Sequence, residues 1–215
     1  MSAGEFNTCA ILDNDSLKCW GNNMSGQLGL GDPQYSVYQA TTPTAVPTAN
    51  LGAGVKSVVA GEYLTCAVLM DGSLKCWGYG NYGSLGYPSG NTLYAPPPEN
   101  VDIGAGRTAK SVTTRSESSH ICVILDNDTL KCYGYNGNAR LGYGDTTTRE
   151  VPDANAIDLG SGKTVTTVSV AYDATCAVLN DGSLKCFGNN GQGQLGIGSY
   201  LPPAGNLPAT VDLGT

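Results

Sequence analysis

Hydrophobic and polar positions alternate along short stretches of this chain, and each stretch ends at a polar or glycine-containing turn. Alternation with a period of two residues is typical of strands that bury one face. Apolar residues spaced three and four apart, which would mark an amphipathic helix, are not sustained along the sequence. The pattern predicts an all-β fold of short antiparallel strands with essentially no helix.

One block of residues occurs four times. Residues 8–12, Thr-Cys-Ala-Ile-Leu, return with conservative changes at 65–69, 121–125 and 175–179, in steps of 57, 56 and 54 residues. Each block is followed by a polar turn, the motif Leu-Lys-Cys-aromatic-Gly and then a Gly-x-Leu-Gly motif at 26–29, 83–86, 139–142 and 193–196, with alanine in place of its first glycine in the third unit. A unit of about 55 residues with several short strands suits a propeller blade, whose period is roughly 40–50 residues. We therefore predict a single propeller-type domain over residues 1–215, with blade units at approximately 1–53, 54–105, 106–161 and 162–215.

The turn of each unit determines how its two central strands pair. With residues 70–72, Met-Asp-Gly, as a three-residue loop, Gly72 takes the left-handed position and Cys66 faces Cys76 across the hairpin. The same register gives the other units these residues at the left-handed position: Asp15, Asp128 and Gly182. Asp is among the few residues other than glycine that tolerate this conformation. All four units are expected to share one hairpin geometry.

The eight cysteines form four Cys-x9-Cys pairs, each predicted to lie across a two-stranded ladder. They predict four cross-strand disulfides: Cys9–Cys19, Cys66–Cys76, Cys122–Cys132 and Cys176–Cys186. The alternatives are buried free thiols in a cytosolic propeller and zinc sites, although the short Cys-x2-4-Cys spacing of structural zinc sites is absent. Disulfides in every unit indicate an extracytoplasmic, oxidising location: secreted, cell-surface, periplasmic or organelle-lumenal.

Residues 60–78, Ala-Gly-Glu-Tyr-Leu-Thr-Cys-Ala-Val-Leu-Met-Asp-Gly-Ser-Leu-Lys-Cys-Trp-Gly, are followed by Gly-Ser-Leu-Gly at 83–86. This motif resembles the regulator of chromosome condensation type 1 repeat, and the resemblance covers all four units. That family forms β-propellers, most often with seven four-stranded blades, so the resemblance implies a propeller here. Four units could form an arc of a larger propeller or a closed four-bladed ring, and we expect the arc.

The charge of the chain limits its partners. It has 18 acidic and 11 basic residues, a formal net charge of −7, and only 13% charged residues, against roughly 25% in ordinary soluble domains. A basic surface for nucleic acid or anionic membrane is therefore not expected. The longest purely apolar stretches, such as Cys66 to Met70, have five residues, whereas a membrane-spanning helix needs about 20, so we expect no direct membrane insertion.

Few residues suit catalysis, a cofactor or a metal. His120 is the only histidine, so a catalytic triad could form only around it, and a structural role in a blade strand is favoured. The G-x-G-x-x-G matches at 78–83 and 191–196 lack the helix that presents its N-terminus to a pyrophosphate. The Asp-Asn-Asp runs at 13–15 and 126–128 lack the later ligands of a calcium loop. We expect no catalytic, cofactor or metal site.

Tyrosines gather in the connections that vary most between units. Tyrosine is enriched at protein interfaces because it buries a large area at low entropic cost and keeps a polar tip. The predicted protein-binding residues are Tyr79, Tyr82, Tyr87, Tyr135 and Tyr143. The alternative is that these rings only pack the loops between blades. Glycosylation sequons at Asn14, Asn23 and Asn127 would matter only in a eukaryotic secretory pathway.

These observations predict a non-catalytic protein-interaction module or assembly subunit in an oxidising compartment, with a protein partner. The alternatives are a guanine-nucleotide-exchange regulator and an enzyme whose site lies in the central channel. The resemblance includes a Ran exchanger whose activity needs a wedge-like insertion, and no insertion interrupts the 54–57-residue period of this chain. No pair of carboxylates specific to one unit supports the enzyme.

Overall fold

The computed structural model describes residues 1–31, 39–40, 42–88, 90–115 and 119–214. These residues form four antiparallel sheets, one in each unit, and three single turns of 3-10 helix. The first sheet contains β1 (Ser2–Ala3), β2 (Asn7–Ile11), β3 (Leu17–Asn22) and β4 (Gln39–Ala40). The second contains β5 (Val55–Ala60), β6 (Leu64–Leu69) and β7 (Leu74–Gly78). The third contains β8 (Ala109–Thr113), β9 (His120–Leu125) and β10 (Leu130–Gly134). The fourth contains β11 (Val165–Val170), β12 (Ala174–Leu179), β13 (Leu184–Gly188) and β14 (Ala209–Val211). The 3-10 turns are η1 (Pro43–Ala45), η2 (Asn81–Gly83) and η3 (Ala204–Asn206).

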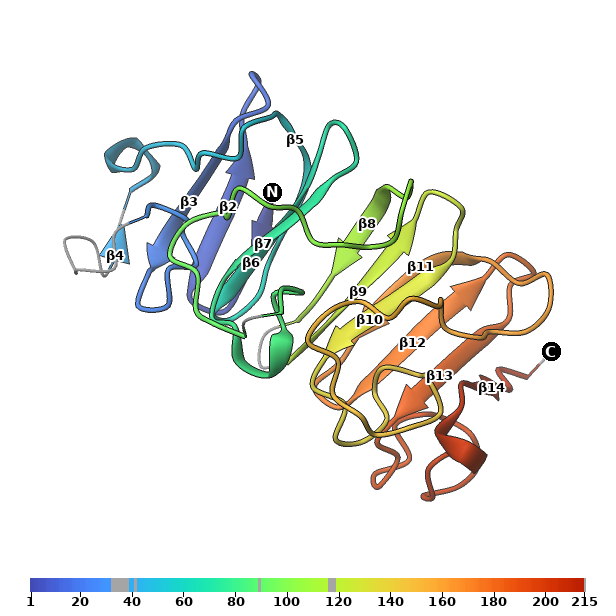
Figure 1. The fold of residues 1–215 in the computed structure, drawn as a ribbon. Coiled ribbons are helices and arrows are strands. Elements are labelled where there is room, and N and C mark those ends of the chain that lie inside the picture. Colours follow the sequence, from blue (N-terminus) through green and yellow to red (C-terminus); the bar gives the residue numbers. More distant parts are fainter. Residues whose placement is uncertain (32–38, 41, 89, 116–118, 215) are drawn as a thin grey trace.

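The predicted all-β class is confirmed. The four sheets follow one another in chain order, with the first and the fourth at opposite ends of the row (Figure 1). The second and third sheets have an isolated β-bridge in place of a fourth strand. The bridge pairs Gly78 with Leu93 in the second sheet and Gly134 with Arg149 in the third. The expected arrangement of the four sheets, an arc of a larger propeller and not a closed four-bladed ring, stays a prediction.

The hairpins have the predicted register. Val68 pairs with Leu74 and Cys66 with Cys76, and the Leu69 amide donates to the Ser73 carbonyl at 2.9 Å. The left-handed positions are occupied as expected, with φ of 61° at Asp15, 82° at Gly72, 60° at Asp128 and 82° at Gly182. Turn chemistry acts locally, so four units of different sequence reach the same geometry.

Each cysteine pair is joined across its own hairpin. The S–S distances lie between 2.04 and 2.14 Å, and the Cα atoms of each pair are 4.1 Å apart. All eight cysteines lie within the described residues, and none of them is free. The bridges therefore link strands within a sheet and leave contacts between sheets to side-chain packing and hydrogen bonds.

Neighbouring sheets pack through the aromatic residue that follows the second cysteine of each unit. Trp77, Tyr133 and Phe187 are completely buried, and each ring lies against the Leu-Gly pair of the preceding unit. A Cβ atom on Gly29 would lie 2.8 Å from Nε1 of Trp77, and this glycine has a φ of 73°. A side chain at Gly29 would therefore separate the first two sheets.

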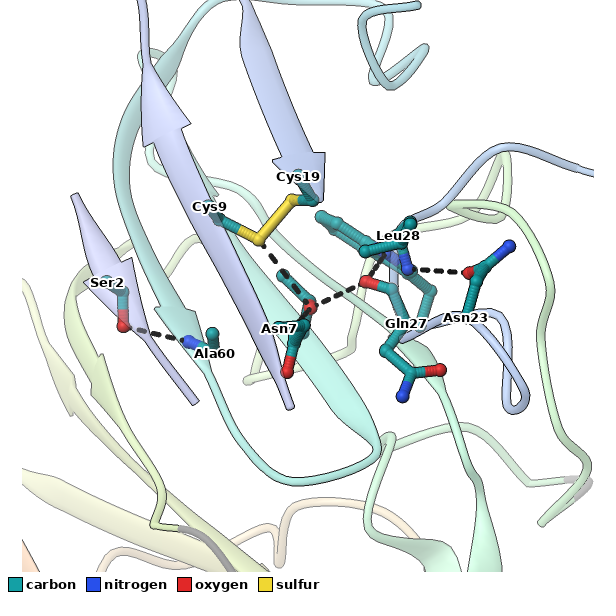
Figure 2. The surroundings of a disulfide bond; sticks show 10 residues. Ser2, Asn7, Cys9, Cys19, Asn23, Gln27, Leu28 and Ala60 are labelled. Atoms are coloured by element: carbon teal, nitrogen blue, oxygen red, sulfur yellow. Dashed lines mark hydrogen bonds between the residues drawn. A yellow bond between two sulfur atoms is a disulfide. The ribbon is translucent and has the colours of Figure 1, made fainter. Parts of the chain in front are cut away.

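Hydrogen bonds repeat at these junctions. Thr65 Oγ1 and Trp77 Nε1 both donate to the carbonyl of Gln27, at 2.8 and 3.1 Å. In the last junction Thr175 Oγ1 donates to the carbonyl of Arg140 at 2.9 Å. Figure 2 shows the first junction, where Ser2 Oγ accepts from the amide of Ala60 beside the Cys9–Cys19 bridge. The aromatic ring against the Leu-Gly pair recurs at all three junctions, and the threonine hydrogen bond recurs at the first and the third, so the sheets form a rigid support for the loops at their edges.

Candidate protein-binding site

Loops from successive sheets meet at the edge opposite the hairpin turns. The residue before β6 and the residue after β7 leave the second sheet at the same edge, because the two strands are antiparallel. These residues are Tyr63 and Tyr79, whose ring centroids lie 6.2 Å apart in an edge-to-face arrangement. Phe6 has the same place before β2, and its ring lies 6.1 Å from that of Tyr63.

The same edge continues in the later sheets. The rings of Tyr82 and Tyr135 lie 4.8 Å apart, and the guanidinium carbon of Arg140 lies 4.7 Å from the centroid of Tyr135 and 6.0 Å from that of Tyr172. We call the following six rings the aromatic row: Phe6, Tyr63, Tyr79, Tyr82, Tyr135 and Tyr172. All except the half-buried Tyr135 are between 39% and 58% exposed, so most of the row is accessible to a partner.

Tyr82 holds an unusual backbone conformation within the row. Its φ of 56° and ψ of 22° place it in the left-handed region, inside η2. A bulky side chain there costs about 1–3 kcal/mol. This conformation accompanies the contact between Tyr82 of the second unit and Tyr135 of the third, so the row is continuous across that junction.

Arg140 fills the junction between the third and fourth sheets. Its side chain is 4% exposed and forms an ion pair with Asp173, and Nη1 donates to the carbonyl of Tyr172 at 2.8 Å. Burial lowers the pKa of the Arg140 guanidinium, and the charge of Asp173 opposes that shift. A guanidinium remains protonated in proteins, so this junction contains a buried cation between two tyrosine rings and a carboxylate.

His120 lies in the same junction. It is completely buried, and its Nε2 lies 2.8 Å from Oγ1 of Thr175. Burial, with a smaller contribution from the nearby charge of Arg140, lowers the pKa of His120 to about 3. The imidazole is therefore neutral at physiological pH and sits inside an interface between sheets.

Family profiles match this chain in several units. One profile described as "Regulator of chromosome condensation (RCC1) repeat" matches residues 16–68, and a second with the same description matches residues 1–27, 55–84 and 165–194. This chain belongs to the RCC1 repeat family.

Two relatives show how widely these repeats are used. The chain is 30% identical over 199 residues to the Ultraviolet-B receptor UVR8 of Arabidopsis thaliana, covering 92% of this chain and 43% of the receptor. It is 28% identical over 200 residues to the probable E3 ubiquitin-protein ligase HERC4 of Mus musculus, covering 93% of this chain and 18% of the ligase. This RCC1-type chain therefore spans less than half the length of either relative.

Solved structures agree on the fold. Human WBSCR16 superposes with a TM-score of 0.78 at 21% identity, covering 98% of this chain and 52% of that one. Yeast RCC1 (Prp20), in a crystal structure with Kap60, superposes with a TM-score of 0.74 at 16% identity, covering 97% of this chain and 47% of that one. The predicted RCC1-type propeller fold is confirmed.

The five tyrosines predicted from the RCC1-type connections separate into two groups. Tyr79, Tyr82 and Tyr135 belong to the aromatic row. Tyr87 and Tyr143 do not reach it, because their hydroxyls accept hydrogen bonds from the amides of Cys76 and Cys132 at 3.4 and 3.3 Å. Burial raises the pKa of Tyr87 to about 12. These two rings pack beside the disulfide strands.

Sequence reasoning missed four members of the site: Phe6, Tyr63, Tyr172 and Arg140. Phe6 and Tyr63 directly precede the first strand of a hairpin, and Tyr172 lies two residues before one. The predicted register already placed such residues at the edge where Tyr79 leaves the sheet. Arg140 occupies the variable position of the Gly-x-Leu-Gly motif, which is Gln27 in the first RCC1 unit. Comparison of that position between units is the signal that could have found it.

The remaining observations concern metal ligands, membrane-spanning helices and the three glycosylation sequons. Among the residues that the structure describes, no group of three His, Cys, Asp or Glu side chains could hold a metal ion, and no helix is long and apolar enough to cross a membrane. Asn23 is buried, and its Oδ1 accepts from the amide of Leu28 at 3.0 Å (Figure 2). Of the three sequons, only those at Asn14 and Asn127 are exposed.

Proposed function

We propose that this chain is a non-catalytic protein-binding module and that its aromatic row is the binding surface. The observation that carries the proposal is the run of aromatic rings across all four sheets, exposed in all but the third, in loops held by a rigid support. Contiguous aromatic surface of this kind is enriched at interface hot spots. A rigid support adds affinity because few side chains lose freedom on binding.

The fold relatives support a protein partner. Yeast RCC1 has been crystallised with Kap60 bound to it, and Prp20p from Saccharomyces cerevisiae has binding properties toward Gsp1p and histones. Those partners belong to those proteins, and we carry over only the class of partner, a protein. The buried, neutral His120 also supports a binding role, because a base enclosed between sheets has no path to a substrate.

Removal of three of the six rings of the aromatic row should remove most of the partner capture. We expect the triple variant Tyr63→Ser, Tyr79→Ser, Tyr82→Ser to retain less than about a tenth of the proteins that the unchanged chain captures from an extract of its source organism, because hot-spot rings contribute about 2 kcal/mol or more each. Tyr200→Ser is the matched control, since Tyr200 is 72% exposed and lies outside the row. Mass spectrometry quantifies each captured protein. Equal capture by the triple variant, with an unchanged melting temperature, would remove the proposal.

We also propose an oxidising compartment, supported by the four disulfides and by the rarity of structural disulfides in reducing cytosol. Protein isolated from its natural source under thiol-blocking conditions should have an intact mass lower by about eight hydrogens than the reduced chain, two for each bridge. A sample reduced in denaturant before blocking serves as the control. Eight blocked thiols in the untreated protein would contradict both the disulfides and the compartment.

A further inference from the structure

One of the positions at which the three junctions between sheets differ determines how far a side chain reaches into them. The second residue of the Gly-x-Leu-Gly motif, or its equivalent, reaches the edge of each junction, and it is Gln27, Ser84 or Arg140. In the first junction Nε2 of Gln27 donates to Oδ1 of Asn22 at 3.0 Å. In the third, the long side chain of Arg140 reaches between Tyr135 and Tyr172. The third junction is thus filled by a side chain of the chain itself, whereas the Gln27 side chain bonds within its own unit.

Among the residues that the structure describes, no side chain takes the place in the second junction that Arg140 takes in the third. Ser84 is too short to fill this place, and its hydroxyl donates to the carbonyl of Tyr79 at 3.1 Å. A cavity of about 170 Å³ lies here, and its walls include Glu62, Tyr63, Tyr79, Asn81, Tyr82 and Ser84. We call it the Ser84 pocket. It lies in the middle of the aromatic row, between the Phe6–Tyr63–Tyr79 rings and the Tyr82–Tyr135 pair.

The walls of the pocket favour a cation. Three tyrosine rings surround it, and ring faces attract Arg and Lys side chains. Glu62 adds a carboxylate, whose hydrogen bond with the neighbouring phenol raises the pKa of Tyr63. Tyrosine rings and a carboxylate also surround Arg140 one junction further along, where Asp173 supplies the negative charge. The counterpart of Asp173 in the second junction is Ser119, and the carboxylate of the pocket comes from Glu62, on the opposite side of the junction. The net charge of −7 also favours an approaching cation.

The size of the pocket points to a single side chain. Small-molecule sites usually enclose about 300–1,000 Å³, and the Ser84 pocket is smaller, at about 170 Å³. A planar guanidinium can stack on a ring and bond a carboxylate at the same time, which the compact ammonium of lysine does less well. The chain itself uses arginine for this arrangement at position 140.

We infer that the Ser84 pocket binds an arginine side chain of a protein partner. The partner's guanidinium would take the place in the second junction that Arg140 takes in the third. This inference rests on the proposed protein-binding function and names the chemistry that the partner must present there.

The test uses the full chain and two short peptides, acetyl-Gly-Arg-Gly-amide and the same peptide with citrulline, which has the shape of arginine without its charge. Nuclear magnetic resonance titration should show saturable shifts of the backbone amides at residues 62–63 and 79–84 with the arginine peptide. We expect its dissociation constant to be at least tenfold lower than that of the citrulline peptide. Equal binding of the two peptides would overturn the inference.

Two variants locate the binding in the pocket. Ser84→Arg places a guanidinium where Arg140 lies in the next junction, so it should weaken binding of the arginine peptide at least tenfold. Gln194→Arg makes a similar change at the equivalent but exposed motif position of the fourth unit, and it should leave binding unchanged. Undiminished binding by a folded Ser84→Arg chain would overturn the inference.

The remaining arms separate this inference from the proposed function. Glu62→Gln should reduce the preference for arginine over citrulline several-fold, and an unchanged preference would count against the pocket even if Ser84→Arg fails to fold. Protein capture that depends on the row tyrosines but is insensitive to Ser84→Arg would overturn the inference and retain the proposed function. Arginine-peptide binding without tyrosine-dependent protein capture would support a cation pocket and remove the protein-binding function.

Discussion

Replacing Arg140 with methionine is expected to lower the free energy of unfolding by about 3 kcal/mol. Methionine keeps most of the length and volume of the side chain but removes the charge that faces Asp173 across the third junction. Breaking a buried pair costs about 3–5 kcal/mol when the other charge stays behind. The lower end of this range applies because the side chain of Asp173 is 19% exposed and keeps a hydrogen bond from Asn189 Nδ2 at 3.3 Å.

Arg107→Met is the matched control for this experiment. Arg107 pairs with Asp126, but the two side chains are 40% and 39% exposed, and exposed pairs contribute about 0–1 kcal/mol. Urea unfolding of the oxidised chain measures both variants. Equal losses at Arg140 and Arg107 would contradict the view that Arg140 holds the third and fourth sheets together.

Acid should destabilise the chain through His120. Its pKa is about 3 in the folded protein and 6.5 in the unfolded chain. The unfolded chain therefore takes up a proton as the pH falls below 6.5, and the folded protein does so only near pH 3. Stability present above pH 6.5 is lost as the pH falls, at about 1.4 kcal/mol for each pH unit between these values.

His120→Asn separates this effect from the titration of carboxylates. Asn7 occupies the equivalent position in the first unit, where its Nδ2 donates to Oγ1 of Thr65 at 3.4 Å, so asparagine can keep a hydrogen bond at position 120 without titrating. As the pH falls from 6.5 to 4.5, the free energy of unfolding of the unchanged chain should decrease more than that of His120→Asn. A difference that stays constant over this range would show that His120 is not held neutral by burial.

The sequence predicted the parts of the fold that depend on neighbouring residues. The repeat, the strand period and the hairpin turns all act within about a dozen residues, which is why the conformations of Asp15 and Asp128 could be predicted from the turn residues alone. The pairing of Cys66 with Cys76 followed from the same turn rule. Closure of the sheets into a ring depends on contacts between distant blades, and no local sequence pattern encodes these contacts.

The site was only partly predictable, because membership of a variable loop does not say at which edge of the sheet a side chain emerges. Tyr79 and Tyr87 are eight positions apart in one connection, yet the first lies in the aromatic row and the second packs beside a disulfide strand. The contact of Arg140 with Tyr172 spans 32 positions and two units. It depends on how sheets stack, which composition and periodicity do not specify.

The confinement of each disulfide to a single hairpin has a consequence for how arrays of this kind can change in evolution. If a disulfide joined two units, neither unit could be lost alone, because deleting one would leave an unpaired thiol in the other. Here every unit carries both halves of its own bridge and meets its neighbour through an aromatic ring and a Leu-Gly pair at the same positions. Gene duplication or loss of a whole unit therefore preserves both the thiol balance and the junction, so the length of such an array can drift while its chemistry of assembly stays the same.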